Sequence, residues 1–114
     1  MKATDERLEA AVVANCQRLV NDWYGSAVPR PYMEVIQQRR AKGSGSTIGA
    51  PDAVLYHRGR PWIIEFKRPH GGRLDNGQVL AIRCRLAAGV DTYVVSNEQE
   101  FADLLSGRLR PHVP

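Results

Sequence analysis

The chain lacks the features that mark several specialised classes of protein. None of the apolar runs in its 114 residues approaches the ~20 residues that a membrane-spanning helix needs. The first stretch, MKATDERLEA, has no signal-peptide core. Cys16 and Cys84 are too few for a disulfide scaffold, and the three histidines lack zinc-ligand spacing. We therefore expect a cytoplasmic protein with buried thiols, no zinc site and no membrane association.

Acidic residues are scarce in the middle of the chain. Residues 30–73 hold nine Lys/Arg against three Asp/Glu, whereas residues 1–29 hold three against four and residues 74–114 hold four against five. The net charge of +4 therefore comes from the middle segment. A basic band of this kind is typical of nucleic-acid binders, although a solubilising surface would have the same charge.

The hydrophobic pattern predicts one domain, residues 1–114, of alternating helices and strands. Asp75 with Gln78 and Ser96 with Gln99 have capping-box spacing, which marks two helix starts. A loose tail is expected over about 107–114, after Gly107. The predicted elements are a helix over 5–23, strands over 32–38, 53–57 and 62–67, a helix from Asp75 to about Ala88, a strand over 92–95 and a helix ending at Leu105.

The connections predict the topology of the sheet. Arg58-Gly59 fits a tight hairpin turn, so strands 53–57 and 62–67 should be antiparallel. The next strand follows a helix, which predicts a parallel pairing through a right-handed crossover. The result is a mixed sheet with helices packed on its faces.

An acidic pair should form beside this hairpin. If Arg58 and Gly59 are the central turn residues, Asp52 lies opposite Glu65, with Cβ atoms roughly 5 Å apart. Two carboxylates so close repel unless a proton or cation lies between them, and Mg²⁺ or Mn²⁺ prefers such oxygen ligands. Lys67 points to the same face, where it could hold a phosphate oxygen or lower the pKa of an attacking water. The alternative is a surface salt-bridge cluster in which Lys67 neutralises both acids; the apolar strand and the basic band favour the metal site.

These residues resemble a known nuclease pattern. Pro51-Asp52 followed by Glu65-Phe66-Lys67 resembles the PD-(D/E)xK motif. The surrounding residues resemble the VRR-NUC branch of this family, which is related to Holliday-junction resolvases. The residues that carry this resemblance are Gly49, Arg68-Pro69, Gly72-Arg73-Leu74, Gln78 and Ala88-Gly89. The resemblance covers roughly residues 5–105. Relatives have Ser-Pro before the helical glutamine, where this chain has Asp75-Asn76-Gly77, which keeps the capping function.

The resemblance implies a fold and an activity. The fold would be the αβββαβα restriction-endonuclease-like one, a mixed sheet with flanking helices. The activity would be that of a Mg²⁺- or Mn²⁺-dependent, structure-selective DNA endonuclease of a bacterium or its phage, which hydrolyses phosphodiesters in branched DNA such as four-way junctions. Symmetric resolution of a junction needs two active sites, so we expect a homodimer. The alternatives are a nuclease for flaps, ends or nicks, and a non-catalytic DNA-binding module that keeps the fold.

The resemblance also implies roles for single residues. Asp52, Glu65 and the Phe66 carbonyl would bind the metal, and Lys67 and Gln78 would be catalytic. A glutamate of the first helix would assist the metal: on a helical wheel Glu9 lies about 40° from the centre of the apolar stripe and Glu6 about 100°, which favours Glu9. Candidate phosphate contacts are Arg39, Arg40, Lys42, Arg68 and Arg73.

Overall fold

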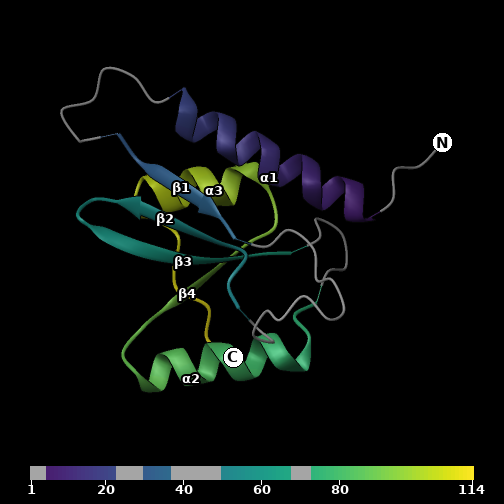
Figure 1. Ribbon diagram of the computed structural model, residues 1–114, viewed down its shortest axis with the longest axis vertical. Helices are drawn as coiled ribbons and strands as arrows, with labels where there is room; N and C mark the ends of the chain where they lie inside the picture. Colours follow the sequence, from purple (N-terminus) through teal and green to yellow (C-terminus); the bar gives the residue numbers. More distant parts are fainter. Residues whose placement is uncertain (1–4, 23–29, 37–49, 68–72) are drawn as a thin grey trace.

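The chain forms a four-stranded sheet between two layers of helices (Figure 1). The structure, a computed structural model, describes residues 5–22, 30–36, 50–67 and 73–114, with side chains from residue 10 onwards. The elements are α1 (Asp5–Asn21), β1 (Tyr32–Val35), β2 (Ala53–His57), β3 (Arg60–Phe66), α2 (Asn76–Ala87), β4 (Thr92–Val95) and α3 (Glu98–Leu105). This order confirms the predicted αβββαβα arrangement.

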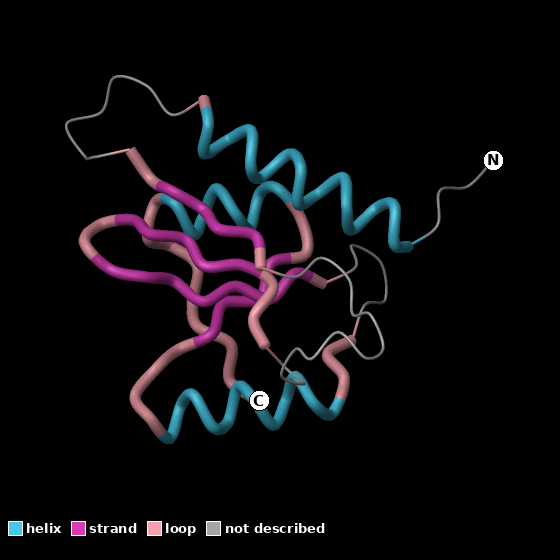
Figure 2. Tube along the Cα trace, viewed as in Figure 1, coloured by secondary structure: helices cyan, strands magenta, loops and turns pink. Residues whose placement is uncertain are grey.

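The strands lie in the order β1-β2-β3-β4 (Figure 2). The first three are antiparallel neighbours, and β4 runs parallel to β3, as predicted from the crossover through α2. The hairpin turn is also confirmed: Arg58 and Gly59 have φ values of 55° and 77°. A turn with positive φ at both central residues has a backbone twist that matches the twist of the two flanking strands, which is why it is favoured in two-residue hairpins. The ladder reaches Ala53 opposite Ile64, and Asp52 follows directly, with its N–H donating to the Ile64 carbonyl at 3.1 Å.

The main hydrophobic core lies on one face of the sheet, under α1 and α3. Successive residues of a strand point to opposite faces, so Ile64 and Phe66 of β3 enter this core with Phe101 and Leu104 of α3. Glu65 must then point to the other face. That face carries α2, which lies below the sheet in Figure 1 and packs at β4.

The caps of α2 and α3 differ in how well their sequences predicted them. At α2, the Asp75 side chain accepts a hydrogen bond from the Gln78 N–H, and the Gln78 Oε1 atom accepts one from the Asp75 N–H, as expected. At α3 the N-cap is Asn97 and not Ser96. Asn97 accepts from the Glu100 N–H, and the Glu100 carboxylate accepts from Ser96. Glu100 therefore takes the place predicted for Gln99, and a carboxylate is a stronger hydrogen-bond acceptor than an amide.

The segment after α3 departs from the expected loose tail. Leu109 packs against the core, and the His112 N–H donates to the Thr92 carbonyl at 2.8 Å. β4 is an edge strand, and an edge offers backbone groups that a passing segment can satisfy. The segment therefore lies along β4. Among the described helices, none is both long and apolar enough to cross a membrane.

Candidate active site

Asp52 is held firmly where β2 begins. Its carbonyl accepts a hydrogen bond from the Ile36 N–H at 2.7 Å, and its N–H donates to the Ile64 carbonyl at 3.1 Å. These bonds hold the Asp52 backbone between the segment after β1 and strand β3. Its side-chain Oδ2 accepts from the Phe66 N–H at 2.8 Å. The carboxylate therefore reaches the end of β3, beside Glu65.

Glu65 is the buried acid of the pair, with 0% of its surface exposed. Burial, and next the charge of Asp52, raise its pKa to about 8, although the Gln78 hydrogen bond and Arg85 both act to lower it. A carboxyl with this pKa is largely protonated at neutral pH when no metal ion is bound. The charge of Asp52 therefore disfavours ionisation of Glu65.

The Phe66 carbonyl lies on the same side as these acids. The Lys67 N–H donates to Val95 of β4 at 2.9 Å. Backbone groups of successive strand residues point in opposite directions, so the N–H and carbonyl of Phe66 face away from β4. Its N–H does reach Asp52, which confirms this direction. Asp52, Glu65 and the Phe66 carbonyl thus converge at the end of β3.

These oxygens suit a hard divalent cation. Among the described residues, buried Glu65 Oε1 has no hydrogen-bond partner, although the Arg85 guanidinium lies 3.6 Å away, and a buried polar oxygen without a hydrogen bond is costly. Carboxylate and carbonyl oxygens are the ligands that Mg²⁺ and Mn²⁺ prefer. The described residues contain no group of three or more Asp, Glu, His or Cys side chains that could hold a metal. Glu6 and Glu9 lie on α1, but their side chains fall outside the described part of the chain.

α2 brings two polar side chains to Glu65. Gln78 Nε2 donates to Glu65 Oε2 at 3.1 Å, and Arg85 Nη2 lies 3.6 Å from Glu65 Oε1. Arg85 Nη1 also donates to Thr92 Oγ1 at 3.0 Å, which fixes the guanidinium against β4. Gln78 was predicted as a catalytic residue that orients Lys67 or the attacking water, and not as a partner of Glu65, whereas Arg85 was not predicted at all. The signal was available: Gln78, Ile82 and Arg85 follow helical spacing, so the stripe that buries Ile82 also carries Arg85.

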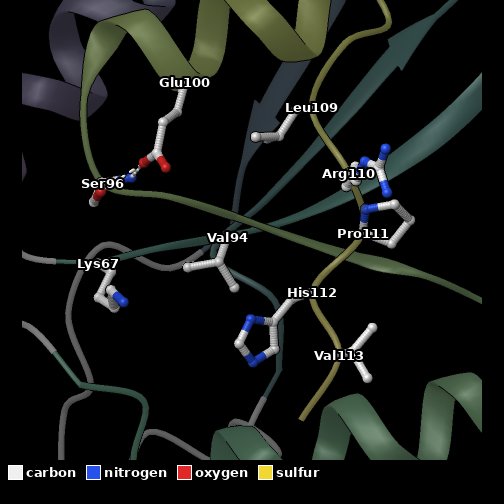
Figure 3. A pocket seen from close by; sticks show the side chains of 9 residues that line it. All are labelled: Lys67, Val94, Ser96, Glu100, Leu109, Arg110, Pro111, His112 and Val113. Carbon is white, nitrogen blue, oxygen red and sulfur yellow. Dashed lines mark hydrogen bonds between the residues drawn. The ribbon is translucent and has the colours of Figure 1, made fainter.

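Lys67 follows β3 directly and shares a face with Glu65 because the two residues are two positions apart. Its side chain lines a pocket together with Val94, the residue that pairs with Glu65 in the parallel register (Figure 3). Of the predicted phosphate contacts, Arg73 is exposed in the segment before α2. Arg39, Arg40, Lys42 and Arg68 lie outside the described residues.

Comparisons with known proteins support the fold. No protein-family model matches the sequence, and no curated protein matches it. A solved structure described as a VRR_NUC domain is similar to this chain, with a TM-score of 0.58 and 18% sequence identity over 91% of this chain and 97% of the other. At this identity the likeness shows the fold alone. It confirms, at that level, the restriction-endonuclease-like class and the resemblance to VRR-NUC domains.

Proposed function

We propose that the chain is a Mg²⁺- or Mn²⁺-dependent deoxyribonuclease that hydrolyses phosphodiester bonds. The observation that carries this proposal is the buried Glu65 carboxylate, which is held against Asp52 at the end of β3 with Lys67 two residues further on. A folded domain gains no stability from two adjoining acids, one of them buried. A bound cation would offset the cost of placing two acids together, which explains this arrangement. The VRR_NUC-like fold supports nuclease chemistry.

Each residue then has a distinct task. Asp52, Glu65 and the Phe66 carbonyl would hold the ion, and Glu9 would assist from α1. When bound, such an ion polarises the scissile phosphate and makes a water more acidic. Lys67 stabilises the negative charge that develops on the phosphate oxygens during attack. Gln78 and Arg85 hold the Glu65 carboxylate in one orientation, and the resemblance implies products with a 5′-phosphate and a 3′-hydroxyl.

The preferred substrate under this proposal is branched DNA. A domain of 114 residues has little surface for reading base sequence, so selectivity would come from DNA shape. A homodimer would present two such sites to a four-way junction, in a bacterial cytoplasm where the gene belongs to the host or to a phage. The basic residues of the middle segment would contact phosphates.

The test is a cleavage assay on labelled linear, flapped, nicked and four-way DNA with Mg²⁺, Mn²⁺, Ca²⁺ or EDTA. Wild-type protein should cut with Mg²⁺ or Mn²⁺ and be inactive in EDTA. Asp52→Asn and Glu65→Gln should abolish cleavage, whereas Asp91→Asn, which removes an exposed acid elsewhere, should cut normally. Cutting in EDTA, or near wild-type cutting by Glu65→Gln, would contradict the proposal. Tight DNA binding with no cleavage in any of these ions would favour the non-catalytic DNA-binding module.

A further inference from the structure

A pocket of about 410 Å³ lies beside Lys67, between the end of β3 and the segment that follows α3 (Figure 3). Val94 forms its floor, and residues 109–113 form the wall opposite Lys67. Its volume falls within the range of small-ligand sites. Because Val94 pairs with Glu65 across the parallel strands, the pocket adjoins the acidic pair.

The wall formed by residues 109–113 is fixed in place. Leu109 packs against the core, and its N–H donates to the Asp103 carbonyl at 3.1 Å. Three residues later, the His112 N–H donates to Thr92 of β4 at 2.8 Å. Arg110 and Pro111 are therefore held between two anchored points, so the pocket exists before any ligand arrives.

The lining combines apolar surface with positive charge. Val94, Pro111 and Val113 are apolar, and the His112 ring points into the space between Val94 and Lys67 (Figure 3). Lys67 lies at one end of the pocket and Arg110 on the opposite wall.

Glu100 is the acidic residue among the described residues of the lining, and its carboxylate is hydrogen-bonded. The Glu100 Oε1 atom accepts from both the N–H and the hydroxyl of Ser96. Two cations on opposite sides of an apolar floor match the chemistry of a nucleotide unit. Such a unit has an anionic phosphate on each side of its deoxyribose, and a base whose flat face can stack on apolar or aromatic side chains.

Building on the proposed nuclease function, we propose that this pocket binds one unpaired nucleotide of the cleaved strand, next to the scissile phosphate. The scissile phosphate would lie at the Lys67 end, and Arg110 would hold the next phosphate. The sugar and base would lie on Val94 and Pro111, with the His112 ring against the base. Under this proposal the pocket, at about 410 Å³, would take a single nucleotide in preference to a base pair, which would favour strands that are already unpaired at a branch or end.

The binding test uses deoxythymidine 3′,5′-bisphosphate, which carries a phosphate on each side of one nucleoside. The ¹⁵N-labelled full chain is titrated in EDTA, so no metal or cleavage is needed, and amide shifts report both the site and the fold. Thymidine and inorganic phosphate are titrated separately. Shifts should centre on residues 94–96 and 109–113, and the bisphosphate should bind at least tenfold more tightly than either fragment.

The variants Arg110→Ala, His112→Ala and Arg108→Ala separate the pocket from general charge. Arg108 belongs to the same segment, does not line the pocket and lies 3.7 Å from Asp103. Arg110→Ala and His112→Ala should each weaken bisphosphate binding, about tenfold for Arg110 because a charge-assisted contact is lost. Arg108→Ala should bind like wild type.

Several outcomes would overturn the pocket assignment. Equal losses of bisphosphate affinity in Arg108→Ala and Arg110→Ala would show unspecific attraction, and equal affinity for inorganic phosphate and the bisphosphate would show a simple anion site.

Failure of the pocket proposal can be told apart from failure of the nuclease proposal. Specific bisphosphate binding in a chain that cuts no DNA would refute the nuclease and leave a nucleotide site, whereas metal-dependent cutting without this binding would refute the pocket alone.

Discussion

Glu65 combines complete burial with a neighbouring acid, and the two together control how its proton is held. Its pKa is raised to about 8 by burial and by Asp52. Between the ordinary pKa of 4.5 and this value, the folded chain keeps a proton that the unfolded chain has released. Burial of Glu65 therefore costs stability at neutral and alkaline pH, unless a cation compensates.

The first prediction, at the scale of single residues, concerns the free energy of unfolding of the metal-free protein. In EDTA, the free energy of unfolding should fall as pH rises from about 4.5 to 8, because the folded state binds the proton more tightly. Glu65→Gln should lose most of this dependence and exceed wild type in stability at pH 8. Denaturant unfolding at several pH values measures both. Asp91→Asn serves as the matched control, since it removes an exposed acid and should follow wild type. A wild-type curve that rises over this range would contradict the assignment.

Lys67 gives the second prediction. Lys67→Ala should lower the cleavage rate by on the order of 10²-fold or more, because the ammonium acts on charge that develops only in the transition state. DNA affinity should change little, since the other cations dominate binding. Single-turnover cleavage and a binding titration in Ca²⁺ measure the two effects separately.

Arg73→Ala provides the contrast for Lys67. Arg73 is exposed and predicted to contact phosphate, so its loss should weaken binding and leave the rate for bound DNA unchanged. If Lys67→Ala loses affinity and rate to the same extent, Lys67 is an ordinary phosphate contact.

At the scale of elements, α2 supports the site from outside the sheet. Its first turn carries Gln78 and its last turn carries Arg85, and both reach Glu65. The same Gln78 side chain closes the capping box with Asp75. Helix stability and the orientation of the Glu65 carboxylate are therefore linked through one side chain.

This link predicts a double effect of Asp75→Ala. Loss of the cap should reduce the free energy of unfolding by about 1 kcal/mol. It should also lower turnover, because a frayed first turn no longer holds the Gln78 amide 3.1 Å from Glu65. Denaturant unfolding and cleavage kinetics measure the two effects. Asp75→Ser restores a capping oxygen and should recover both. Unchanged turnover in a destabilised Asp75→Ala protein would show that the Gln78 contact is dispensable for catalysis.

At the scale of the whole molecule, the excess of basic residues over 30–73 coincides with the segment that holds Asp52, Glu65 and Lys67. Positive charge around the proposed cation-binding centre would attract a polyanion to the groups proposed to be catalytic. A single domain offers one such centre. A two-fold dimer would double it and extend the basic surface across several duplex arms.

We therefore predict a homodimer that cuts four-way junctions by paired incisions. Light scattering at micromolar concentration should give twice the mass of the 12.7 kDa chain. A cruciform plasmid assay should release linear product without accumulating a nicked intermediate. Affinity should fall steeply with salt, because many phosphate contacts release counterions. A strict monomer that nicks flaps and ignores junctions would favour the alternative nuclease.

Short-range patterns in the chain were sufficient for much of the fold and for the core of the site. Arg58-Gly59 specified the hairpin, and a two-residue turn leaves one register. That register predicted that Asp52 would lie close to Glu65, and the Asp52 side chain does reach the adjacent Phe66 N–H. The cap of α2 was equally local, since Asp75 and Gln78 lie within one turn. Such features depend on neighbours a few residues away, where backbone geometry leaves few choices.

Contacts between distant segments required the folded chain. Arg85 could be assigned to the sheet-facing stripe of α2, but its approach to Glu65 depends on how the whole helix packs on β4. The segment 109–113 gave no sign in the sequence that it would line a pocket with Lys67, and its composition had suggested a loose tail. These placements follow from burying Leu109 and from satisfying the free edge of β4. Both gains arise only when residues far apart in the chain have been brought together, so no local pattern encodes them.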